Sequence, residues 1–219
     1  MNPEYITEKT RSVFHELSRE KFLNDYTLVG GTSLSLRINH RLSEDLDFIY
    51  DDEFIDSRGI RKFIDKRFKG RYKLLKQDDD HQLDFLIEDV KVTFFSAGAM
   101  SIGFDLKKYS EKYWEINVAT TEIISVLKVN EITQRNTVRD YYDLYFIAIH
   151  YVSLKKIFEM SKELLPNLPD IIYTETILYT DDIIEESIGD HLQAAEKISK
   201  LEMSAFFENE LKKYFTKKN

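Results

Sequence analysis

The sequence predicts an α+β fold, in which a β-rich N-terminal part with flanking helices is followed by a helical C-terminal region. Two observations support this prediction. Short β-prone runs bounded by Gly, Asn and Asp recur up to residue 118. From residue 120 onward the hydrophobic residues repeat instead with a period of about 3.6, which is typical of helices. We therefore expect a first domain over residues 1–118 and a second over residues 119–219.

The composition is that of an ordered globular protein. The 219 residues are 42% hydrophobic and 13% aromatic, which is enough to build a hydrophobic core. No apolar run approaches the ~20 residues of a membrane-spanning helix, and the charged N-terminus is unlike a signal peptide. The lack of cysteine excludes disulfides and thiolate metal sites. We expect a cytoplasmic protein that does not bind membranes.

The first elements are a helix over residues 6–23 and a short strand over Tyr26–Val29. In the helix, Ile6, Val13, Phe14 and Leu17 have the spacing of an inward-facing stripe. Both elements are expected to pack in the core.

Two glycines, Gly30 and Gly31, end this strand and are followed by the hydroxyls of Thr32 and Ser33. Glycines that open a helix allow backbone N–H groups to approach a phosphate. The apolar residues at 34, 36 and 38 alternate, so a second strand after a hairpin turn also fits this stretch.

Two carboxylates, Asp45 and Asp47, stand one residue apart in the next β-prone run. Residues i and i+2 of a strand project to the same face, so these side chains would lie side by side. Carboxylates that close repel each other unless a cation lies between them. Mg²⁺ suits such a pair, because it takes one or two protein carboxylates and completes its shell with water and phosphates. A glycine pair alone is more often a plain turn, and a carboxylate pair alone is more often a solvated strand edge. At this spacing the two together indicate a nucleotide-handling site.

The stretch GGTSLSLRINHRLSEDLDF, residues 30–48, resembles the nucleotidyltransferase superfamily typified by DNA polymerase β. Within it, the GGT, HR-x-S and DLDF elements are similar to those of the AbiEii/AbiGii abortive-infection toxin family, over about residues 26–145. The resemblance implies a nucleotidyltransferase core with a small mixed β-sheet flanked by helices, and a helix after Gly31. It also implies Mg²⁺ (or Mn²⁺) at Asp45 and Asp47, and an NTP whose triphosphate lies against Gly30, Gly31, Thr32 and Ser33. Arg41 would brace the loop before DLDF or meet a phosphate.

Residues 57–69 predict an amphipathic and strongly basic helix, with Gly70 after its end. The segment 57–76 has nine Lys or Arg and one acid, whereas the whole chain has a net charge of −8. Clustered basic charge is typical of a surface that binds a phosphate backbone, although a solvated surface helix is the alternative. The candidate RNA-binding residues are Arg58, Arg61, Lys62, Lys66, Arg67 and Lys69.

Residues 71–96 predict three strands, with the acidic triplet 78–80 as a hairpin loop. In the nucleotidyltransferase pattern a third carboxylate on the last of these strands faces the acidic pair. This chain has Thr93 there, which could supply a hydroxyl but no charge. Asp84 on the neighbouring strand is a candidate substitute.

The segment 96–113 is predicted to be loop-rich, and Trp114–Val118 to be a short edge strand. Three further helical segments follow residue 151, at 153–165, 169–178 and 190–215, as a lid or a packing platform. The basic ending Lys212–Asn219 could touch RNA, but a frayed tail is the simpler interpretation.

A lysine, Lys128, stands in the apolar helix that follows residue 119. An ammonium group in such surroundings needs an anion or a path to water. A structural partner would be Asp143 or Glu131, and a functional partner would be the triphosphate. Asp140 belongs to a capping box that starts at Thr137 and is predicted to be a cap. In the toxin family a later Lys and Asp belong to the active site, and Lys128 and Asp143 match them within LK…QR…RDYYDL.

These observations and the resemblance predict transfer of a nucleoside monophosphate from an NTP to a hydroxyl acceptor, with Asp45, Asp47, Lys128 and Asp143 as catalytic residues. The resemblance implies that the acceptor is RNA, such as a tRNA 3′ end, and that a cognate antitoxin controls this toxin. Two alternatives stay open. One is a catalytically silent nucleotide- or partner-binding module, which the Thr93 departure suggests. The other is a nucleotidyltransferase that modifies a protein or a small molecule.

Overall fold

The computed structural model describes residues 1–216, so the last three residues of the basic ending lie outside the described chain. The chain divides into two compact units, Met1–Thr120 and Thr121–Asn219. Each unit is described by itself below.

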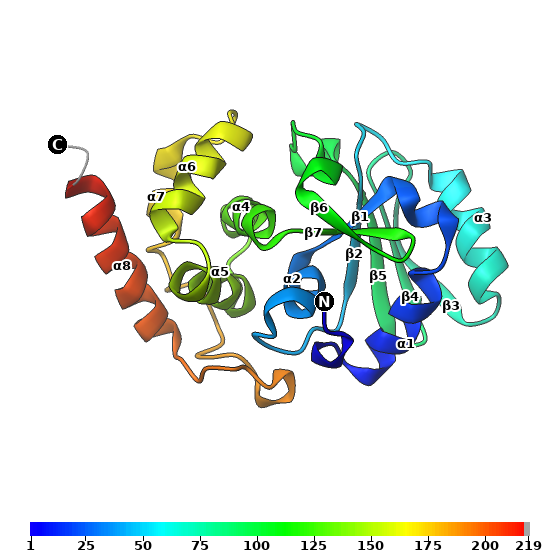
Figure 1. Ribbon diagram of the computed structural model, residues 1–219, viewed down its shortest axis with the longest axis horizontal. Helices are drawn as coiled ribbons and strands as arrows, with labels where there is room; N and C mark the ends of the chain where they lie inside the picture. Colours follow the sequence, from blue (N-terminus) through cyan, green and yellow to red (C-terminus); the bar gives the residue numbers. More distant parts are fainter. Residues whose placement is uncertain (217–219) are drawn as a thin grey trace. The chain divides into compact units, whose positions relative to one another are not determined.

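The N-terminal unit is built on a seven-stranded mixed sheet with the order β3-β4-β5-β2-β1-β7-β6 (Figure 1). β1 pairs in parallel with β7, and β2 pairs in parallel with β5, while the other neighbours are antiparallel. The strands are β1 (Tyr26–Val29), β2 (Leu46–Tyr50), β3 (Tyr72–Asp78), β4 (Gln82–Ile87), β5 (Val90–Ser96), β6 (Ser110–Tyr113) and β7 (Ile116–Ala119). The predicted mixed sheet flanked by helices is thereby confirmed.

One strand prediction was wrong. The strand expected at an edge over Trp114–Val118 is β7, which lies inside the sheet between β1 and β6. The edge strand is β6, in the segment that the sequence marked as loop-rich. The rest of that segment contains the 3₁₀ turns η3 (Gly98–Met100) and η4 (Leu106–Tyr109).

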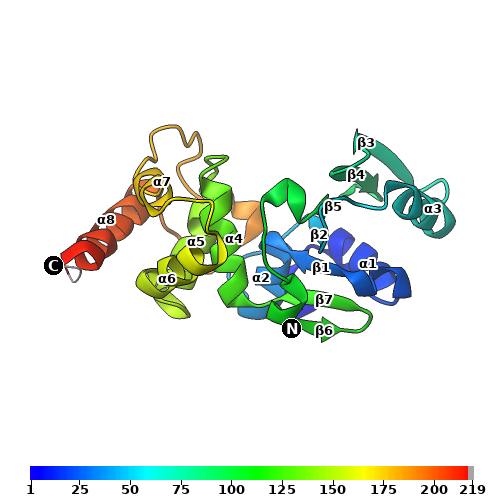
Figure 2. The ribbon, with the colours of Figure 1, turned by 90° about the horizontal axis from the view of Figure 1, so that it is seen from above.

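Three helices accompany the sheet: α1 (Glu8–Leu17), α2 (Gly30–Ile38) and α3 (Ser57–Phe68). α2 begins at the glycine pair, so the helix that the resemblance implied is present and the hairpin is not. It ends at Asn39, whose φ of 57° gives a left-handed C-cap. The expected helix 6–23 is shorter, because α1 ends at Leu17 and the 3₁₀ turn η2 (Lys21–Asp25) follows; a further turn, η1 (Pro3–Tyr5), precedes α1. The turned view in Figure 2 follows the same elements from above.

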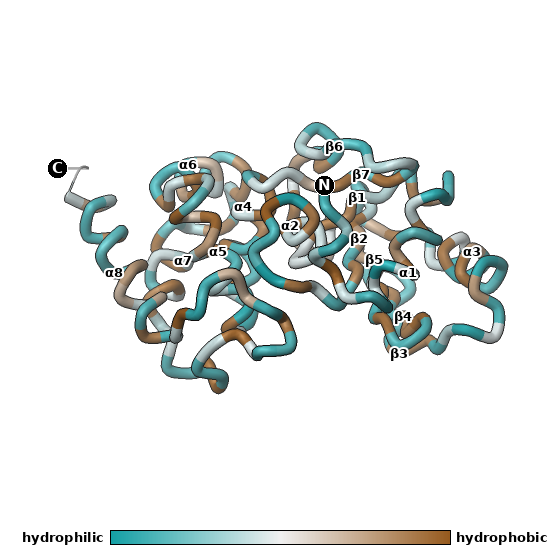
Figure 3. Tube along the Cα trace, turned by 60° about the horizontal axis from the view of Figure 1, so that its bottom comes forward, coloured by the Kyte–Doolittle hydropathy of each residue, from teal (hydrophilic) through white to brown (hydrophobic). Residues whose placement is uncertain are grey.

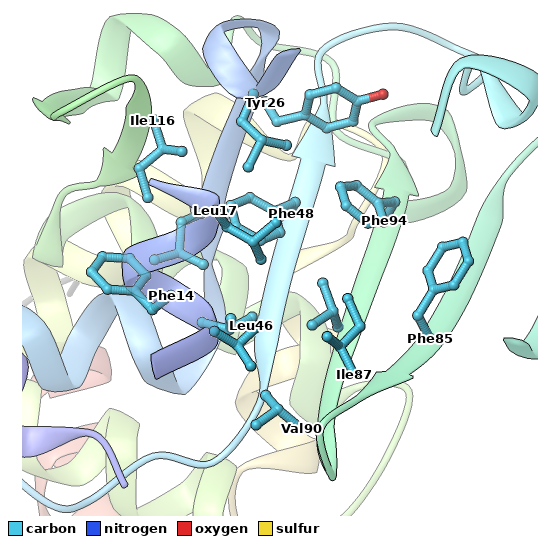
Figure 4. Close-up of a cluster of buried hydrophobic side chains, with 14 of the residues drawn as sticks. Phe14, Leu17, Tyr26, Leu46, Phe48, Phe85, Ile87, Val90, Phe94 and Ile116 are labelled. Atoms are coloured by element: carbon cyan, nitrogen blue, oxygen red, sulfur yellow. The ribbon is translucent and has the colours of Figure 1, made fainter. Parts of the chain in front are cut away.

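The core of this unit lies on the sheet face that carries α1 and α3. Leu46 and Phe48 of β2 pack there with Phe94 of β5 and with side chains from both helices. Figure 4 shows Phe14 and Leu17 of α1 against this face. Because side chains alternate along a strand, Asp47 projects to the opposite face. The core therefore determines which face of the sheet carries the acidic residue.

The C-terminal unit is helical. Its helices are α4 (Thr121–Ile132), α5 (Val138–His150), α6 (Leu154–Leu164), α7 (Asp170–Thr176) and α8 (Lys200–Thr216), with the 3₁₀ turn η5 (Asp190–Leu192) before α8. Large aromatic side chains fill its interior, among them Tyr141, Tyr142, Phe158, Tyr173 and Phe207. The helix expected over 190–215 is confined to α8, which starts ten residues later than predicted. Among residues 1–216, no helix is long and apolar enough to cross a membrane.

Candidate functional site

The first candidate site lies where β1 meets α2. Gly30 has a φ of +68°, in the left-handed region that favours glycine. A Cβ atom built on Gly30 would lie 3.0 Å from Oδ2 of Asp47. The glycine therefore gives the Asp47 carboxylate room to lie directly against the start of the helix.

The second glycine makes room for a cation. A Cβ atom on Gly31 would lie 2.6 Å from Nη2 of Arg41 and 3.1 Å from Oγ of Ser43. Arg41 is buried, at 4% exposure, and its Nη1 donates to the carbonyl of Leu42 at 3.0 Å. The HR-x-S element therefore packs against the N-terminus of α2, which agrees with the expected bracing role of Arg41. Ser43 is the serine of this element, and the sequence assigned it no role of its own.

The two hydroxyls after the glycines form internal hydrogen bonds. Thr32 Oγ1 donates to the carbonyl of Asp45 and is hydrogen-bonded to Ser43 Oγ at 2.9 Å. Ser33 Oγ donates to the carbonyl of Ala119 at 2.9 Å, which ties α2 to the end of β7. These bonds fix the helix and the loop before β2. The groups that the start of α2 offers to an anion are thus its first-turn backbone N–H groups, which have no partner within the helix.

Asp47 lies within β2, and Asp45 is the residue just before it. Both are partly exposed. Among residues 1–216, no group of three or more His, Asp and Glu side chains is arranged to hold a metal ion. Two carboxylates with one or two oxygen ligands each still fit Mg²⁺, which relies on water and phosphate oxygens for the rest of its shell.

A polar row crosses the same face of the sheet beside Asp47. Thr93 of β5 pairs with Asp47 on one side and with Asp84 of β4 on the other. Directly paired residues project to the same face, and neighbouring strands are about 4.8 Å apart. Thr93 is fully buried, and its Oγ1 has no hydrogen-bond partner among the described residues. Asp84 accepts from Gln82 at 2.7 Å and lies 3.4 Å from Lys91.

The basic helix α3 packs on the other face of the sheet, through Ile60, Ile64 and Phe68. Figure 3 shows hydrophobic and hydrophilic residues alternating along it. Arg61 pairs with Asp79, and Arg67 with two glutamates of the N-terminal segment. Within the described chain the remaining four basic residues form no ion pair and are exposed: Arg58, Lys62, Lys66 and Lys69. At i, i+4, i+8 and i+11, these four form one stripe along the outer side of α3.

A cavity of about 590 Å³ opens at the other end of β2 and is lined by Asp51, Asp52, Glu53 and Asp105, among others. Burial, together with the nearby Asp105 carboxylate, raises the pKa of Asp51 to about 6. The sequence did not single out this acidic cavity.

The second candidate site is a buried ionic cluster between α4 and α5. Lys128 is 3% exposed, and its Nζ lies 2.6 Å from Asp140, 2.9 Å from Glu131 and 3.1 Å from Asp143. Arg135 adds a second cation, with its Nε 2.9 Å from Asp140. The structural partners expected for Lys128 are therefore present. The predicted capping box does begin at Thr137, which is the N-cap of α5 and whose Oγ1 accepts from the backbone N–H of Asp140. Asp140 was expected to be the cap, but its backbone N–H is the group that is capped. The sequence did not predict that Asp140 would be the nearest partner of Lys128.

The cluster stabilises its charged forms. Burial alone would lower the pKa of Lys128, but the carboxylates, with Asp140 foremost, raise it above the ordinary value for lysine. Burial likewise works to raise the pKa of Asp140, but Lys128 and Arg135 hold it well below the usual range. For Glu131 burial prevails over the cations, and its pKa is raised.

Comparison with protein families gives a match over nearly the whole chain. The model of the family described as nucleotidyl transferase AbiEii toxin, Type IV TA system, matches residues 11–214. An uncharacterised protein of Aquifex aeolicus (strain VF5) is 30% identical over 211 residues, which cover 93% of this chain and 98% of that protein.

Solved structures show the same fold at lower identity. A proposed nucleotidyltransferase from Helicobacter pylori matches with a TM-score of 0.51 and 20% identity, and covers 96% of this chain and 98% of its own. MenT4, a nucleotidyltransferase toxin from Mycobacterium tuberculosis H37Rv, matches with a TM-score of 0.53 and 14% identity, and covers 93% of this chain and 84% of its own.

Proposed function

Because the chain belongs to the AbiEii nucleotidyltransferase toxin family, we propose that it transfers a nucleoside monophosphate from an NTP to a hydroxyl of RNA. A tRNA 3′ end is the proposed acceptor, and a cognate antitoxin the proposed regulator. Such a reaction draws on the NTP and RNA of the cytoplasm. The observation that supports the proposal most is the Asp47 carboxylate held against Gly30, at the N-terminus of a helix.

In the proposed reaction the triphosphate lies at the start of α2. There the first-turn backbone N–H groups and the positive end of the helix dipole favour an anion. The hydroxyls of Thr32 and Ser33 contribute indirectly, because their hydrogen bonds keep this end of α2 in place. Arg41, beside Gly31, adds a positive charge next to the phosphates.

Asp45 and Asp47 are the proposed ligands of Mg²⁺ or Mn²⁺. A bound divalent ion would offset phosphate charge and polarise the α-phosphorus. The carboxylates would also orient the nucleotide. Asp47 is held in a fixed position for this, because it lies in the central strand, which is hydrogen-bonded on both sides.

Lys128 and Asp143 stay in the proposal as catalytic residues on the strength of the family motifs. Lys128 would offset charge on the leaving pyrophosphate. Its ammonium has three carboxylate neighbours, so contact with a phosphate requires that one of them be exchanged.

RNA contacts are proposed for the basic residues of α3. The four unpaired side chains, Arg58, Lys62, Lys66 and Lys69, are the main candidates, because they are exposed and repeat about every 6 Å along the helix. Arg61 and Arg67 already pair with carboxylates, so we expect them to contribute less.

The test is transfer of label from each α-³²P NTP, with Mg²⁺, to total RNA, total protein or aminoglycosides. We expect labelled RNA with the wild type and none with Asp47→Asn or after chelation of the metal. Label on protein or on aminoglycosides instead would replace RNA as the acceptor. NTP binding without any labelling, unchanged by Asp47→Asn, would show a silent binding module and overturn the proposal.

A further inference from the structure

The buried hydroxyl of Thr93 is unused in the free protein. It is fully buried and has no partner among the described residues, although it lies in a row of polar groups between Asp47 and Asp84. A buried hydroxyl without a hydrogen bond is unfavourable for folding. A valine of nearly the same shape would avoid this cost, so stability alone does not explain the threonine.

The position of Thr93 relative to the helix suggests a use. Within the sheet, β1 lies on one side of β2 and β5 on the other. Gly30, at the start of α2, directly follows β1 and faces the Asp47 side chain, whereas Thr93 is the neighbour of Asp47 on the β5 side. The proposed triphosphate site and Thr93 therefore lie on opposite sides of Asp47.

Phosphoryl transfer needs this kind of arrangement. The attacking oxygen and the leaving oxygen lie roughly in line, on opposite sides of the phosphorus. With the pyrophosphate leaving on the α2 side, the acceptor hydroxyl has to approach from the β5 side. The polar groups of the row on that side are Thr93 and, one strand further, Asp84.

We propose that Thr93 receives the acceptor hydroxyl of RNA and relays its proton to Asp84, an inference that rests on the proposed nucleotidyl transfer. The acceptor oxygen bonds to the α-phosphorus as the bond from that phosphorus to the pyrophosphate oxygen breaks. The acceptor proton passes to Thr93 Oγ1, whose own proton passes to the carboxylate of Asp84. Thr93 thus performs, without a charge of its own, part of what a third carboxylate could do.

Access to Thr93 requires a small rearrangement. Its hydroxyl is covered in the free protein, so the acceptor reaches it after neighbouring side chains on the same face have moved. The Asp84–Lys91 pair is suited to this, because its 3.4 Å separation is long and the Lys91 side chain is 44% exposed.

The test compares three variants of the full chain: Thr93→Val, Thr93→Ser and Thr27→Val. Thr27 is the matched control, since it is a buried strand threonine whose hydroxyl also has no partner among the described residues. We expect Thr93→Val to lower kcat about tenfold or more, the worth of one hydrogen bond made in the transition state. Its KM for NTP should stay unchanged. Its melting temperature should not fall below that of the wild type. Thr93→Ser should restore most of the rate, and Thr27→Val should leave it unchanged.

A binding measurement supplies a readout that is independent of turnover. The wild type should bind an acceptor RNA with a normal 3′ end more tightly than the same RNA with a 2′,3′-dideoxy end. Thr93→Val should lose this preference, whereas Thr27→Val should keep it.

The outcomes separate this inference from the function it rests on. If Asp47→Asn abolishes labelling but Thr93→Val labels RNA at the wild-type rate, the role of Thr93 is wrong and nucleotidyl transfer stands. A Thr93→Val protein that melts lower, and is slow only in proportion to its unfolded fraction, would also overturn the inference. If Asp47→Asn labels RNA normally, the proposed function itself fails.

Discussion

Gly30 and Gly31 are adjacent, yet they are glycines for different physical reasons. Gly30 has a positive φ and faces the Asp47 carboxylate, so a side chain there meets both backbone strain and a close contact. Gly31 has no positive φ, and a side chain there would meet mainly the end of the Arg41 side chain and Ser43. The pair is therefore more than a turn: one glycine makes room for an anion and the other for a cation.

The two substitutions should consequently differ. We expect Gly30→Ala to lower the free energy of unfolding by about 1–2 kcal/mol, the cost of a left-handed non-glycine residue. Gly31→Ala should cost less, because Arg41 can shift, but it should weaken NTP binding by moving that guanidinium. Urea unfolding and nucleotide titration of both variants check this. Equal losses of stability would contradict the assignment.

Asp51 provides a pH prediction. Its folded-state pKa, about 6, is raised above the ordinary value near 4. A raised pKa favours folding below pH 4, and this contribution is lost as the pH rises through 6. Asp51→Asn should therefore gain stability relative to the wild type between pH 4.5 and 7. Unfolding curves at these two pH values measure the difference, and a difference that does not depend on pH would refute the raised pKa of this half-buried carboxyl.

At the scale of the element, α4 and α5 are joined by charges as well as by apolar contacts. Removal of one partner from a buried cluster leaves the others uncompensated, at a cost of about 3–5 kcal/mol. Lys128→Met should therefore strongly destabilise the protein at pH 7. The loss should shrink as the pH falls towards 4. In the variant, the buried carboxylates that have lost Lys128 are then neutralised by protons. Lys155→Met is the control, since its exposed pair with Glu159 at 3.7 Å contributes under about 1 kcal/mol.

The stripe on α3 makes a second prediction at this scale. Replacement of Arg58, Lys62, Lys66 and Lys69 by Gln should weaken RNA binding and reduce its dependence on salt. The logarithmic slope should fall by about 0.7 for each phosphate of single-stranded RNA that the variant no longer neutralises. Arg61→Gln with Arg67→Gln is the matched control and should change the slope less. Binding measured from low to high salt tests this. An unchanged slope in the fourfold variant would remove α3 from the proposed RNA site.

At the scale of the whole molecule, the sequence predicted local features better than distant ones. The amphipathic α3 carries its signal within a few residues and formed as expected, and the DLDF strand formed from Leu46 onward, with Asp45 just before it. The helix after the glycine pair was implied by the resemblance, because the local alternation also fitted a strand. The placement of β7 inside the sheet depends on its parallel pairing with β1, about ninety residues earlier in the chain. No local pattern marks such a pairing. For the same reason Asp140 was expected to be a cap but not the nearest partner of Lys128.

The position of β2 makes a prediction for the whole sheet. β2 is the central strand, with β5 on one side and β1 on the other, whereas β3 and β6 are edges. Backbone amides of β2 should therefore exchange hydrogen most slowly in the sheet, and those of β3 and β6 fastest. Hydrogen exchange followed by mass spectrometry on peptides covering these strands measures the order. Rapid exchange in β2 would be inconsistent with this sheet order.

The parallel pairings also determine the stage of protein synthesis at which the site can form. The strand of Asp47 must wait for β5, some forty residues further along, and β1 must wait for β7. A ribosome adds residues one at a time, and long-range parallel pairings form only after both partners have emerged. A nascent chain that has the glycine pair and both acids consequently still lacks β5 and β7, and the first unit becomes complete only once residues up to about 120 have left the exit tunnel.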